Sequence, residues 1–330
     1  MSRIAVLGAG AWGTALAISL SRRGGHEILL WSHSAALAEQ LTDVGENLPY
    51  LPGFTLPAGI DVTADLPAAI FEADILLCVT PSQYLRGVIR EIAPLLTRDQ
   101  ILVTASKGLE EGTNLRMSQV IASITNNRCA VLSGPSFAQE VAAGIPTAIV
   151  VAANLPSLAL NIQREFSSST LRIYTNDDVA GVELGGALKN VVALAAGVVN
   201  GLNLGHNSCA ALITRGISEI TRLAIACGGR RQTLSGLSGI GDLVLTCNGS
   251  LSRNRSVGIE LGRGRHLPDI LAGMHGKVAE GIRSTGAALQ LAARYGVEMP
   301  ITEQMDAILH HNKSPRDAIR DLMSRPGREE

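Results

Sequence analysis

The feature that most constrains this chain is a glycine-rich turn close to its start. An apolar run, Ile4–Leu7, leads into Gly8, Gly10 and Gly13, which follow the spacing GxGxxG, and a helical pattern begins at Thr14. In such a turn the first glycine permits a tight bend, the second lets the backbone approach a pyrophosphate, and the third lets the helix pack on the strand. The N–H groups and positive dipole end of that helix attract phosphate. The turn therefore predicts a dinucleotide-binding βαβ unit.

Short apolar runs alternate with longer helical patterns through the first half of the chain. Runs rich in β-branched residues predict strands at Ile4–Leu7, Glu27–Trp31, Asp74–Val79, Gln100–Thr104, Ala130–Leu132 and Ala148–Val151. Helical patterns lie between them at Thr14–Arg23, Ser34–Leu41, Ser82–Leu96 and Leu115–Ser123. Such alternation indicates βαβ units and a parallel sheet. Because right-handed crossovers bring the carboxyl ends of the strands to one edge, we expect ligands to bind there.

The pattern changes near residue 175. Beyond Val179 the chain is rich in Ala, Gly and Leu, and helices are predicted at Val182–Val199, Ser208–Ala226, Arg255–Gly262, Gly281–Tyr295 and Ile301–His311. A single hydrophobic core stops growing near ~250–300 residues, so two domains are expected. We predict an α/β, Rossmann-like dinucleotide-binding domain over residues 1–178, followed by a mostly α-helical C-terminal domain over residues 179–330.

Composition and charge exclude several classes of protein. Hydrophobic residues make up 46% of the chain and charged residues 17%, which excludes a disordered chain. The 28 basic and 29 acidic residues give a net charge of −1, without the basic excess that a nucleic-acid binder usually carries. We therefore expect a small-molecule ligand and no nucleic-acid partner.

Cysteine spacing and hydropathy predict a cytoplasmic protein. The five cysteines lie far apart, with neither a CxxC pair nor metal-ligand spacing, as in a reduced chain without a metal site. The N-terminal residues do not have the form of a signal peptide. The longest apolar run, Leu184–Val199, carries Lys189 and is interrupted by glycines, so we expect no membrane span.

Lys189 is the only charged residue in that run, and it is our candidate for proton transfer. Burial of an ammonium without a partner is costly and lowers the pKa of an amine toward the working range. Such a lysine donates a proton in a reduction and accepts one in an oxidation. The alternative is a lysine whose stem lies along the helix while its ammonium reaches the surface.

Asp242 and Thr246 form a second candidate group. Asp242 follows Gly239–Gly241, which we expect to be a flexible turn that aims the carboxylate at Lys189. The alternative is a helix N-cap, which aspartate also favours. Thr246 lies one helical turn further on and is expected to face the same pocket.

The end of the second strand bears on cofactor choice. An Asp or Glu at this position would bind the ribose 2′-hydroxyl and favour NAD. The chain has Trp31–Ser34 instead, with His33 as a donor that suits a 2′-phosphate. We therefore expect NADPH to be preferred and NADH to be usable. The alternative for His33 is a solvated loop histidine.

Six motifs together resemble one enzyme family. They are Gly8–Gly13 with Trp12, Ala105–Gly108, Leu132–Ala138, Gly186–Asn190, Gly239–Leu243 and Ser252–Arg255. In this order and spacing they resemble the NAD(P)-dependent sn-glycerol-3-phosphate dehydrogenases of the bacterial type, over nearly the whole chain. The resemblance implies reversible reduction of dihydroxyacetone phosphate to sn-glycerol 3-phosphate, with the product feeding glycerophospholipid synthesis.

The resemblance also implies roles for individual residues. Lys189 and Asp242 are expected to be catalytic. The expected substrate-binding residues are Lys107, Gly134, Ser136, Lys189, Asn190, Asp242, Ser252, Arg253 and Asn254. The expected cofactor-binding residues are Gly8, Gly10, Ala11, Trp12, Gly13, His33, Tyr50, Lys107, Ala138, Arg253 and Glu280. For Lys107 the alternative is a solvated loop lysine, for Tyr50 it is packing of its own loop, and Arg255 is expected to be a helix-surface charge.

Two other functions are compatible with parts of the sequence. A β-hydroxyacid or 6-phosphogluconate type dehydrogenase also joins a dinucleotide domain to a helical domain with a catalytic lysine, although Gly134–Ala138 and Ser252–Asn254 argue against it. A nucleotide-sensing regulator would carry a helix-turn-helix or a basic face, and neither is visible. The Ala- and Leu-rich helices predict a homodimer formed through the helical domain.

Overall fold

The computed structural model describes residues 2–274 and 279–327, and the chain divides into two compact units. The first unit comprises residues 1–110 and 115–183, and the second comprises residues 111–114 and 184–330. Helix α8 (Val179–Gly201) crosses from one unit to the other, since its residues 179–183 belong to the first unit and the rest to the second.

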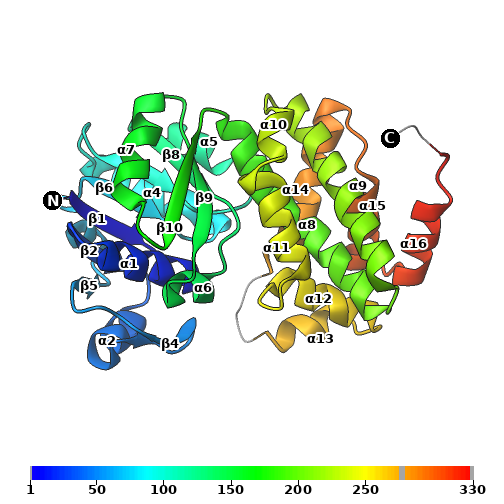
Figure 1. The fold of residues 1–330 in the computed structure, drawn as a ribbon, viewed down its shortest axis with the longest axis horizontal. Helices are drawn as coiled ribbons and strands as arrows, with labels where there is room; N and C mark the ends of the chain where they lie inside the picture. The colour runs from blue at the N-terminus through cyan, green and yellow to red at the C-terminus, as the bar shows by residue number, and fades with distance from the viewer. Residues whose placement is uncertain (1, 275–278, 328–330) are drawn as a thin grey trace. The chain divides into compact units, whose positions relative to one another are not determined.

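The first unit is built on one large sheet (Figure 1). Its eight strands, in the spatial order β10-β9-β8-β7-β6-β1-β2-β5, are β1 (Ser2–Leu7), β2 (His26–Trp31), β5 (Ile60–Thr63), β6 (Ile75–Cys78), β7 (Ile101–Thr104), β8 (Cys129–Ser133), β9 (Thr147–Ala152) and β10 (Leu171–Asn176). A separate ribbon pairs β3 (Glu46–Asn47) with β4 (Leu51–Thr55). The predicted strands correspond to β1, β2, β6, β7, β8 and β9.

Two features of the sheet differ from the prediction. Strands β5 and β10 were not predicted, because both lie at the edges of the sheet and lack the continuous buried run of a central strand. Strands β8 and β9 pair antiparallel, with Leu132 opposite Val151, so β9 and β10 run against the other six strands. The expectation that all carboxyl ends share one edge is therefore wrong for β9 and β10.

The strand order reverses between β1 and β6, and in open α/β sheets ligands bind at such a point. From β1 the chain continues through β2 to β5 on one side, whereas β6, β7 and β8 follow one another on the other side. At the point where the order reverses, loops from the two strands diverge and leave room for a ligand beyond their carboxyl ends. The glycine turn follows β1 at this edge.

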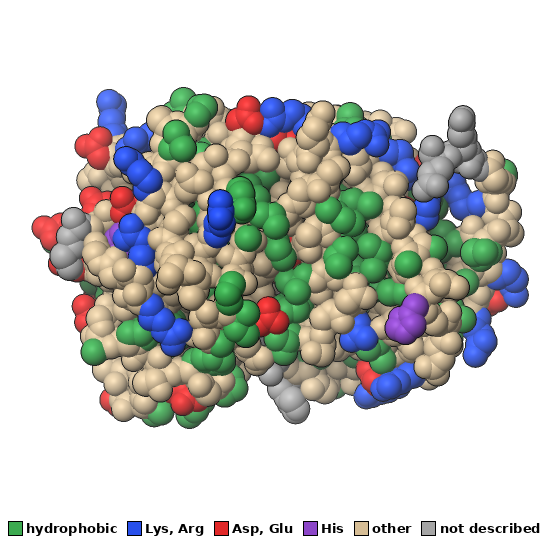
Figure 2. Space-filling view, in the orientation of Figure 1, with side chains coloured by type: hydrophobic (Ala, Val, Ile, Leu, Met, Phe, Trp, Pro, Cys, Tyr) green, Lys and Arg blue, Asp and Glu red, His purple; other side chains and the backbone are tan. Residues whose placement is uncertain are grey.

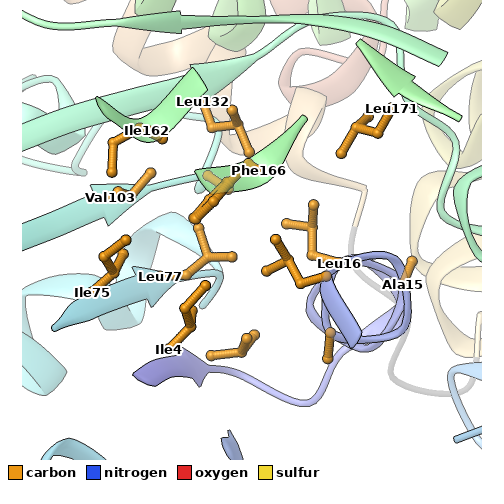
Figure 3. Packing of buried hydrophobic residues seen from close by; sticks show 14 of the residues in the cluster. Ile4, Ala15, Leu16, Ile75, Leu77, Val103, Leu132, Ile162, Phe166 and Leu171 are labelled. Atoms are coloured by element: carbon orange, nitrogen blue, oxygen red, sulfur yellow. The ribbon is translucent and has the colours of Figure 1, made fainter. Parts of the chain in front are cut away.

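Helices cover both faces of the sheet. On one face lie α1 (Ala11–Arg23), α6 (Ala138–Ala143) and α7 (Pro156–Phe166), and on the other lie α3 (Leu66–Ile70), α4 (Ser82–Ile92) and α5 (Met117–Ala122). Along β1, Ile4 and Val6 join the first layer while Ala5 and Leu7 join the second. Figure 3 shows the first layer, where Phe166 and Leu16 pack against residues of the central strands. Helix α2 (Ala35–Val44) follows β2.

The second unit is mostly helical and has no strand among the residues that the structure describes, as predicted. After α8 its helices are α9 (Gly205–Ala226), α10 (Arg231–Leu234), α11 (Asp242–Asn248), α12 (Arg253–Gly262), α13 (Leu267–Ala272), α14 (Glu280–Tyr295), α15 (Pro300–His310) and α16 (Pro315–Met323). The fold class is therefore confirmed. The sequence pattern did not predict α10, α11, α13 and α16, which are too short to show a clear 3.6-residue period.

Helix α8 is the one helix, among residues 2–274 and 279–327, that is long and apolar enough to cross a membrane. Its whole apolar stretch is nevertheless buried by protein. Val191, Leu194 and Val198 pack in one core cluster with side chains of α12, α13, α15 and α16. This burial is what a core helix requires.

Helices α8 and α12 touch through their backbones. A Cβ atom built on Gly258 would lie 2.0 Å from the Leu194 carbonyl oxygen, and one built on Gly197 would lie 2.1 Å from the Arg255 carbonyl oxygen. Gly201 and Gly262 make equivalent contacts one turn further along. Only glycine allows an approach this close, so these four positions fix the spacing between α8 and the first turn of α12.

Charged side chains of both signs are scattered over the face drawn in Figure 2. No broad patch of one sign covers that face. This distribution agrees with the balanced composition of the chain.

Candidate active site

The glycine turn after β1 has the geometry that a pyrophosphate site requires. Gly8 adopts a φ of 132°, and a Cβ built on it would lie 2.9 Å from the Val79 carbonyl oxygen at the end of β6. A Cβ built on Gly13 would lie 1.9 Å from the Gly8 carbonyl oxygen. In contrast, a Cβ built on Gly10 would meet nothing within 4 Å. Gly8 and Gly13 are thus required by the fold, while Gly10 leaves open space at the N-terminus of α1.

These residues fit a dinucleotide. The open space at Gly10 lies where α1 presents unpaired N–H groups, and the first turn of α1 contains no acidic residue. Next to it, the indole Nε1 of Trp12 is buried and has no hydrogen-bond partner among residues 2–274 and 279–327. A buried donor of this kind is costly unless something binds it.

Asn47 holds the glycine turn in place, and the sequence did not indicate it. Its amide nitrogen donates to the Ala9 carbonyl oxygen at 2.9 Å and to the Thr14 hydroxyl at 2.7 Å, and the residue is fully buried. Its Oδ1 accepts from the backbone N–H of Tyr50 at 3.3 Å. Tyr50 itself is exposed, so its ring is available on the segment that Asn47 anchors to the turn.

The end of β2 carries no carboxylate. Leu7 pairs with Trp31 in the parallel register, and His33 follows two residues later, with its ring exposed and edge-on to the Trp31 indole. Ser32 is buried and its hydroxyl donates to the Ser34 carbonyl oxygen at 3.0 Å. The exposed side chains with donor groups at this position are the His33 imidazole and the Ser34 hydroxyl.

Lys107, Gly134 and Ser136 come together at the same edge of the sheet. Lys107 follows β7, and its ammonium donates to the Gly134 carbonyl oxygen at 2.9 Å. The Ser136 hydroxyl donates to the same oxygen at 3.0 Å. Gly134 has a φ of 133° and lies against Ile149 of β9, so the turn after β8 is tight. Ala138 begins α6 directly after this turn.

In the second unit, Lys189 lies on α8 and forms a buried cluster with α11. Its ammonium donates to Asp242 Oδ1 in a close ion pair and to Thr246 Oγ1 at 2.9 Å. Lys189 is 7% exposed, Asp242 0% and Thr246 5%. The Thr246 hydroxyl also donates to the Asp242 carbonyl oxygen at 2.6 Å, which orients its lone pairs toward Lys189. The lysine is buried and paired, so it does not reach the surface along its helix.

The turn that aims Asp242 is helical and tightly packed. The expected flexible turn is wrong, because residues Leu237–Gly241 form a π-helical turn that runs directly into α11. A Cβ built on Gly239 would lie 2.0 Å from the Leu234 carbonyl oxygen, and one built on Gly185 of α8 would lie 2.5 Å from the Ser238 carbonyl oxygen. The Gly185 contact brings the turn against α8 and the Gly239 contact brings it against α10, and the carboxylate that follows is directed to Lys189.

The first turn of α12 carries an exposed cation between two buried polar residues. Ser252 is the N-cap, and its hydroxyl accepts from the Arg255 backbone N–H at 3.2 Å. Arg253 is exposed, and within the described part of the chain its guanidinium has no partner. Arg255 is not the expected surface charge, because it donates to Asn200 Oδ1 of α8 through Nε at 3.1 Å and Nη2 at 2.7 Å.

Asn190 and Asn254 are joined in the core of the second unit. The Asn254 amide nitrogen donates to Asn190 Oδ1 at 3.0 Å, and Asn254 Oδ1 accepts from the Gly281 backbone N–H at 2.9 Å. Glu280, the residue before Gly281, begins α14 and is partly buried. The structure therefore brings Asn254 to Asn190, and it directs Asn190 and Lys189 toward different helices.

Cys247 lies beside this cluster on α11 and takes no charged part in it. Burial raises the pKa of the Cys247 thiol to about 12, so it stays protonated at neutral pH. All five cysteines are free, as expected. In the described residues no group of His, Cys, Asp or Glu could hold a metal ion.

Comparisons with known proteins agree with this geometry. Residues 3–159 match the family described as the N-terminus of NAD-dependent glycerol-3-phosphate dehydrogenase, and residues 178–320 match its C-terminus. The chain is 60% identical to a glycerol-3-phosphate dehydrogenase [NAD(P)+] of Acidobacterium capsulatum, over 100% of both chains. It is 56% identical to the protein of the same name from Koribacter versatilis, over 99% of this chain and 98% of the other.

A solved structure gives the same result for the fold. The glycerol-3-phosphate dehydrogenase of Coxiella burnetii superimposes with a TM-score of 0.94 at 39% identity, covering 98% of this chain and 99% of that one. The resemblance noted in the sequence is confirmed, and the chain belongs to the NAD-dependent glycerol-3-phosphate dehydrogenase family.

Proposed function

We propose that the protein reversibly reduces dihydroxyacetone phosphate to sn-glycerol 3-phosphate with NADPH or NADH. The observation that carries this proposal is the buried Lys189–Asp242–Thr246 cluster in a chain of this family. A lysine held in this way supplies the proton that reduction of a ketone requires.

The bound cofactor would supply the hydride, and the glycine turn, Trp12, Tyr50, His33, Ala138 and Glu280 are the residues that would hold it. Lys107 and Arg253 would contact both the cofactor and the substrate. The N-terminus of α1 would receive the pyrophosphate at Gly10, where the structure leaves open space. Because no carboxylate follows β2 and His33 is exposed there, we propose that NADPH is preferred.

The substrate would be held by charge and by hydrogen bonds. The exposed guanidinium of Arg253, beside the N-cap Ser252, suits a dianionic phosphate, since arginine offers a planar fork of donors. Lys107, Gly134, Ser136 and Asn190 would complete the set of substrate contacts. In the reduction, the Lys189 ammonium gives its proton to the oxygen that becomes the hydroxyl, and Asp242 holds the lysine in place before and after the transfer.

A substrate panel tests this proposal directly. With NADPH in excess, the fall in absorbance at 340 nm is measured on adding dihydroxyacetone phosphate, dihydroxyacetone or a 2-keto acid. We expect rapid turnover of the phosphorylated triose alone. With NADP+ in place of NADPH, oxidation of a β-hydroxyacid or 6-phosphogluconate by a protein that leaves dihydroxyacetone phosphate inert would instead favour the other class of dehydrogenase. Comparing kcat/KM for NADPH and NADH tests the cofactor preference.

We also propose that the enzyme works in the cytoplasm as a homodimer and supplies the backbone of glycerophospholipids. Support for a cytoplasmic location comes from the free cysteines and from the burial of α8. Light scattering at low protein concentration tests the dimer. Growth that becomes dependent on added glycerol 3-phosphate after conditional depletion tests the metabolic role.

A further inference from the structure

One buried amide, that of Asn47, joins the glycine turn to the ribbon of β3 and β4. Its Nδ2 donates to the Ala9 carbonyl oxygen at 2.9 Å and to the Thr14 hydroxyl at 2.7 Å, and its Oδ1 accepts from the Tyr50 backbone N–H at 3.3 Å. The residue is 0% exposed, so no water competes for these bonds. The amide therefore holds together the glycine turn, the first turn of α1 and the segment that carries Tyr50.

The orientation of this amide is fixed by partners that have one role only. A backbone N–H can only donate, and a backbone carbonyl oxygen can only accept. The Asn47 atom that meets the Tyr50 N–H must therefore be the oxygen, and the atom that meets Ala9 must be the nitrogen. A side chain without a donor at this position would leave the Ala9 carbonyl oxygen unbound or set a second oxygen against it.

The bond to Ala9 determines which way the next peptide unit faces. In a planar trans peptide the C=O and the N–H point in opposite directions. Because Asn47 binds the Ala9 carbonyl oxygen inside the protein, the Gly10 N–H points to the other side. It has no acceptor on any residue whose position the structure describes, and Gly10 is only partly buried. This donor is therefore left for a ligand.

Gly10 cannot hold this orientation by itself. A glycine has no Cβ, so the peptide before it rotates at little cost. A rotated peptide would present the Ala9 carbonyl oxygen, which carries partial negative charge, where the unrotated one presents an N–H. An anionic phosphate is attracted by the N–H and repelled by the oxygen. The turn thus needs a donor from elsewhere in the chain, and Asn47 supplies it.

The ribbon that carries Asn47 is itself firmly held. Leu51 of β4 is fully buried in the core layer that includes α1, and β4 packs against α1 and α6. Across the ribbon, Glu46 Oε1 accepts from the Gly53 N–H at 2.6 Å. Asn47 therefore acts on the glycine turn from a fixed position and not from a free loop.

We propose that Asn47 is a positioning residue for the cofactor. Its amide holds the Ala9–Gly10 peptide with the N–H toward the dinucleotide phosphates, and it keeps Tyr50 in a fixed place beside the glycine turn. This inference rests on the cofactor part of the proposed function and not on the identity of the triose. A residue with this role changes the affinity for the cofactor, whereas a residue that only stabilises the fold does not.

Two substitutions of Asn47 remove the donor with little change in volume. Asn47→Leu leaves the Ala9 carbonyl oxygen unbound and adds no charge, whereas Asn47→Asp sets a carboxylate against that oxygen. We expect the Kd for NADPH, measured by fluorescence titration, to rise about tenfold in Asn47→Leu and about 10- to 100-fold in Asn47→Asp. At saturating NADPH, kcat and the KM for dihydroxyacetone phosphate should stay within about twofold of the wild-type values.

Gln100 provides a matched control in the same unit. It is a buried amide whose nitrogen donates to the Ile70 and Ala73 carbonyl oxygens at 2.9 Å each, and whose oxygen accepts from the Thr97 N–H at 2.9 Å. It directly precedes β7, at the edge of the sheet opposite the glycine turn. Gln100→Glu makes the same exchange of amide for carboxylate as Asn47→Asp. It should lower the thermal unfolding midpoint and leave the Kd for NADPH within about twofold.

The variants decide the proposal in either direction. An unchanged Kd in Asn47→Leu, or equal rises in Asn47→Asp and Gln100→Glu, would overturn it. A rise confined to Asn47→Asp would also overturn it, because the added charge would then explain the whole effect. A wild-type protein that binds NADPH without turning over dihydroxyacetone phosphate would mean that the proposed reaction has failed, and the same titrations would still decide the role of Asn47.

A measurement on the wild-type protein depends on no variant being stable. In ¹⁵N-labelled protein, we expect NADPH binding to move the amide proton resonance of Gly10 downfield, as for an N–H that donates to a phosphate oxygen. The resonance of Gly286, where α14 is far from the glycine turn in sequence and belongs to the other unit, serves as the reference. A Gly10 resonance that NADPH leaves unmoved would contradict the proposal.

Discussion

Both units use glycine to bring two backbones together, but the partners differ in their distance along the chain. In the first unit, Gly13 lies against Gly8, a member of the same short motif. In the second unit, Gly258 on α12 lies against Leu194 on α8, far earlier in the chain. The first contact forms one turn at the end of a strand, and the second sets the distance between two long helices.

The two arrangements also serve different ends. The turn in the first unit leaves open space at Gly10, where a ligand backbone can approach. The crossing in the second unit leaves no space, and it holds Arg253 and Asn254 close to the helix that carries Lys189 and Asn190. The comparison teaches that open space at a glycine where a helix N-terminus follows a strand is suited to a ligand, whereas a glycine in backbone contact indicates a packing constraint.

The largest effect is expected from Lys189→Met, which removes the proposed proton donor on α8 of the second unit. We expect kcat for reduction of dihydroxyacetone phosphate to fall about a thousandfold, because general acid catalysis contributes about 10²–10⁴. Binding of NADPH, measured by fluorescence titration, should not change. The same substitution at Lys313, which is bonded to Gln304 and Asp321, serves as a control and should keep full activity.

Stability must be measured in parallel, because Lys189→Met leaves the buried Asp242 carboxylate without its ammonium partner. The double variant Lys189→Met, Asp242→Asn removes that stranded charge. It should recover part of the unfolding free energy without recovering turnover. Substantial turnover in either variant would contradict the role given to Lys189.

The next effect tests the helix crossing directly. Gly258→Ala forces a methyl group against the Leu194 carbonyl oxygen, and we expect the free energy of unfolding to fall by about 3 kcal/mol, since overpacking in a tight core costs about this much. Gly286→Ala on α14 is the matched control, because a Cβ there meets nothing within 4 Å. It should stabilise the protein by about 0.5–1 kcal/mol through helix propensity. Denaturant unfolding of both variants provides the comparison.

A smaller effect is expected for the glycine turn. Gly10→Ala should weaken NADPH binding about 10- to 100-fold, or about 1.4–2.7 kcal/mol, because the methyl group occupies the space intended for the pyrophosphate. The unfolding free energy should change by less than about 1 kcal/mol. Gly13→Ala, measured without cofactor, should mainly lower the free energy of unfolding, because its methyl group would clash with the Gly8 carbonyl oxygen. A Gly10→Ala protein that binds NADPH with wild-type affinity would show that the open space at Gly10 does not receive the pyrophosphate.

The smallest effect concerns pH. Glu219 of α9 is buried and accepts from the backbone N–H groups of Ile301 and Thr302 at the start of α15, at 2.9 Å and 3.0 Å. Burial raises the pKa of this carboxyl above its ordinary value, and the hydrogen bonds only partly oppose the shift. A raised pKa in the folded state means that the associated stability is present at low pH and is lost as pH rises through that pKa.

Glu219→Gln removes this titration. We therefore expect the stability of the wild-type chain, relative to Glu219→Gln, to decrease as pH rises from below the ordinary glutamate pKa toward neutrality. Urea unfolding of both proteins at several pH values provides the measurement. A difference that is constant with pH would show that Glu219 keeps an ordinary pKa in the folded protein.

Much of the first unit could be predicted because its signals are local. The central strands are buried on both faces and therefore appear as continuous apolar runs, whereas the edge strands β5 and β10 do not. The reversal of β9 could not be predicted, because a short apolar run has no direction. Asn47 was missed for a similar reason, since nothing in its neighbourhood indicates that it binds the glycine turn.

By itself the sequence determined the glycine turn, the alternation of strands and helices, and the presence of one lysine in an apolar helix, because each depends on neighbours along the chain. Only the tertiary structure decided that the turn before Asp242 is π-helical, that Arg255 binds Asn200, and that Asn254 donates to Asn190. These relations depend on how closely α8, α11, α12 and α14 pack, and that distance is set by backbone contacts between residues remote in sequence.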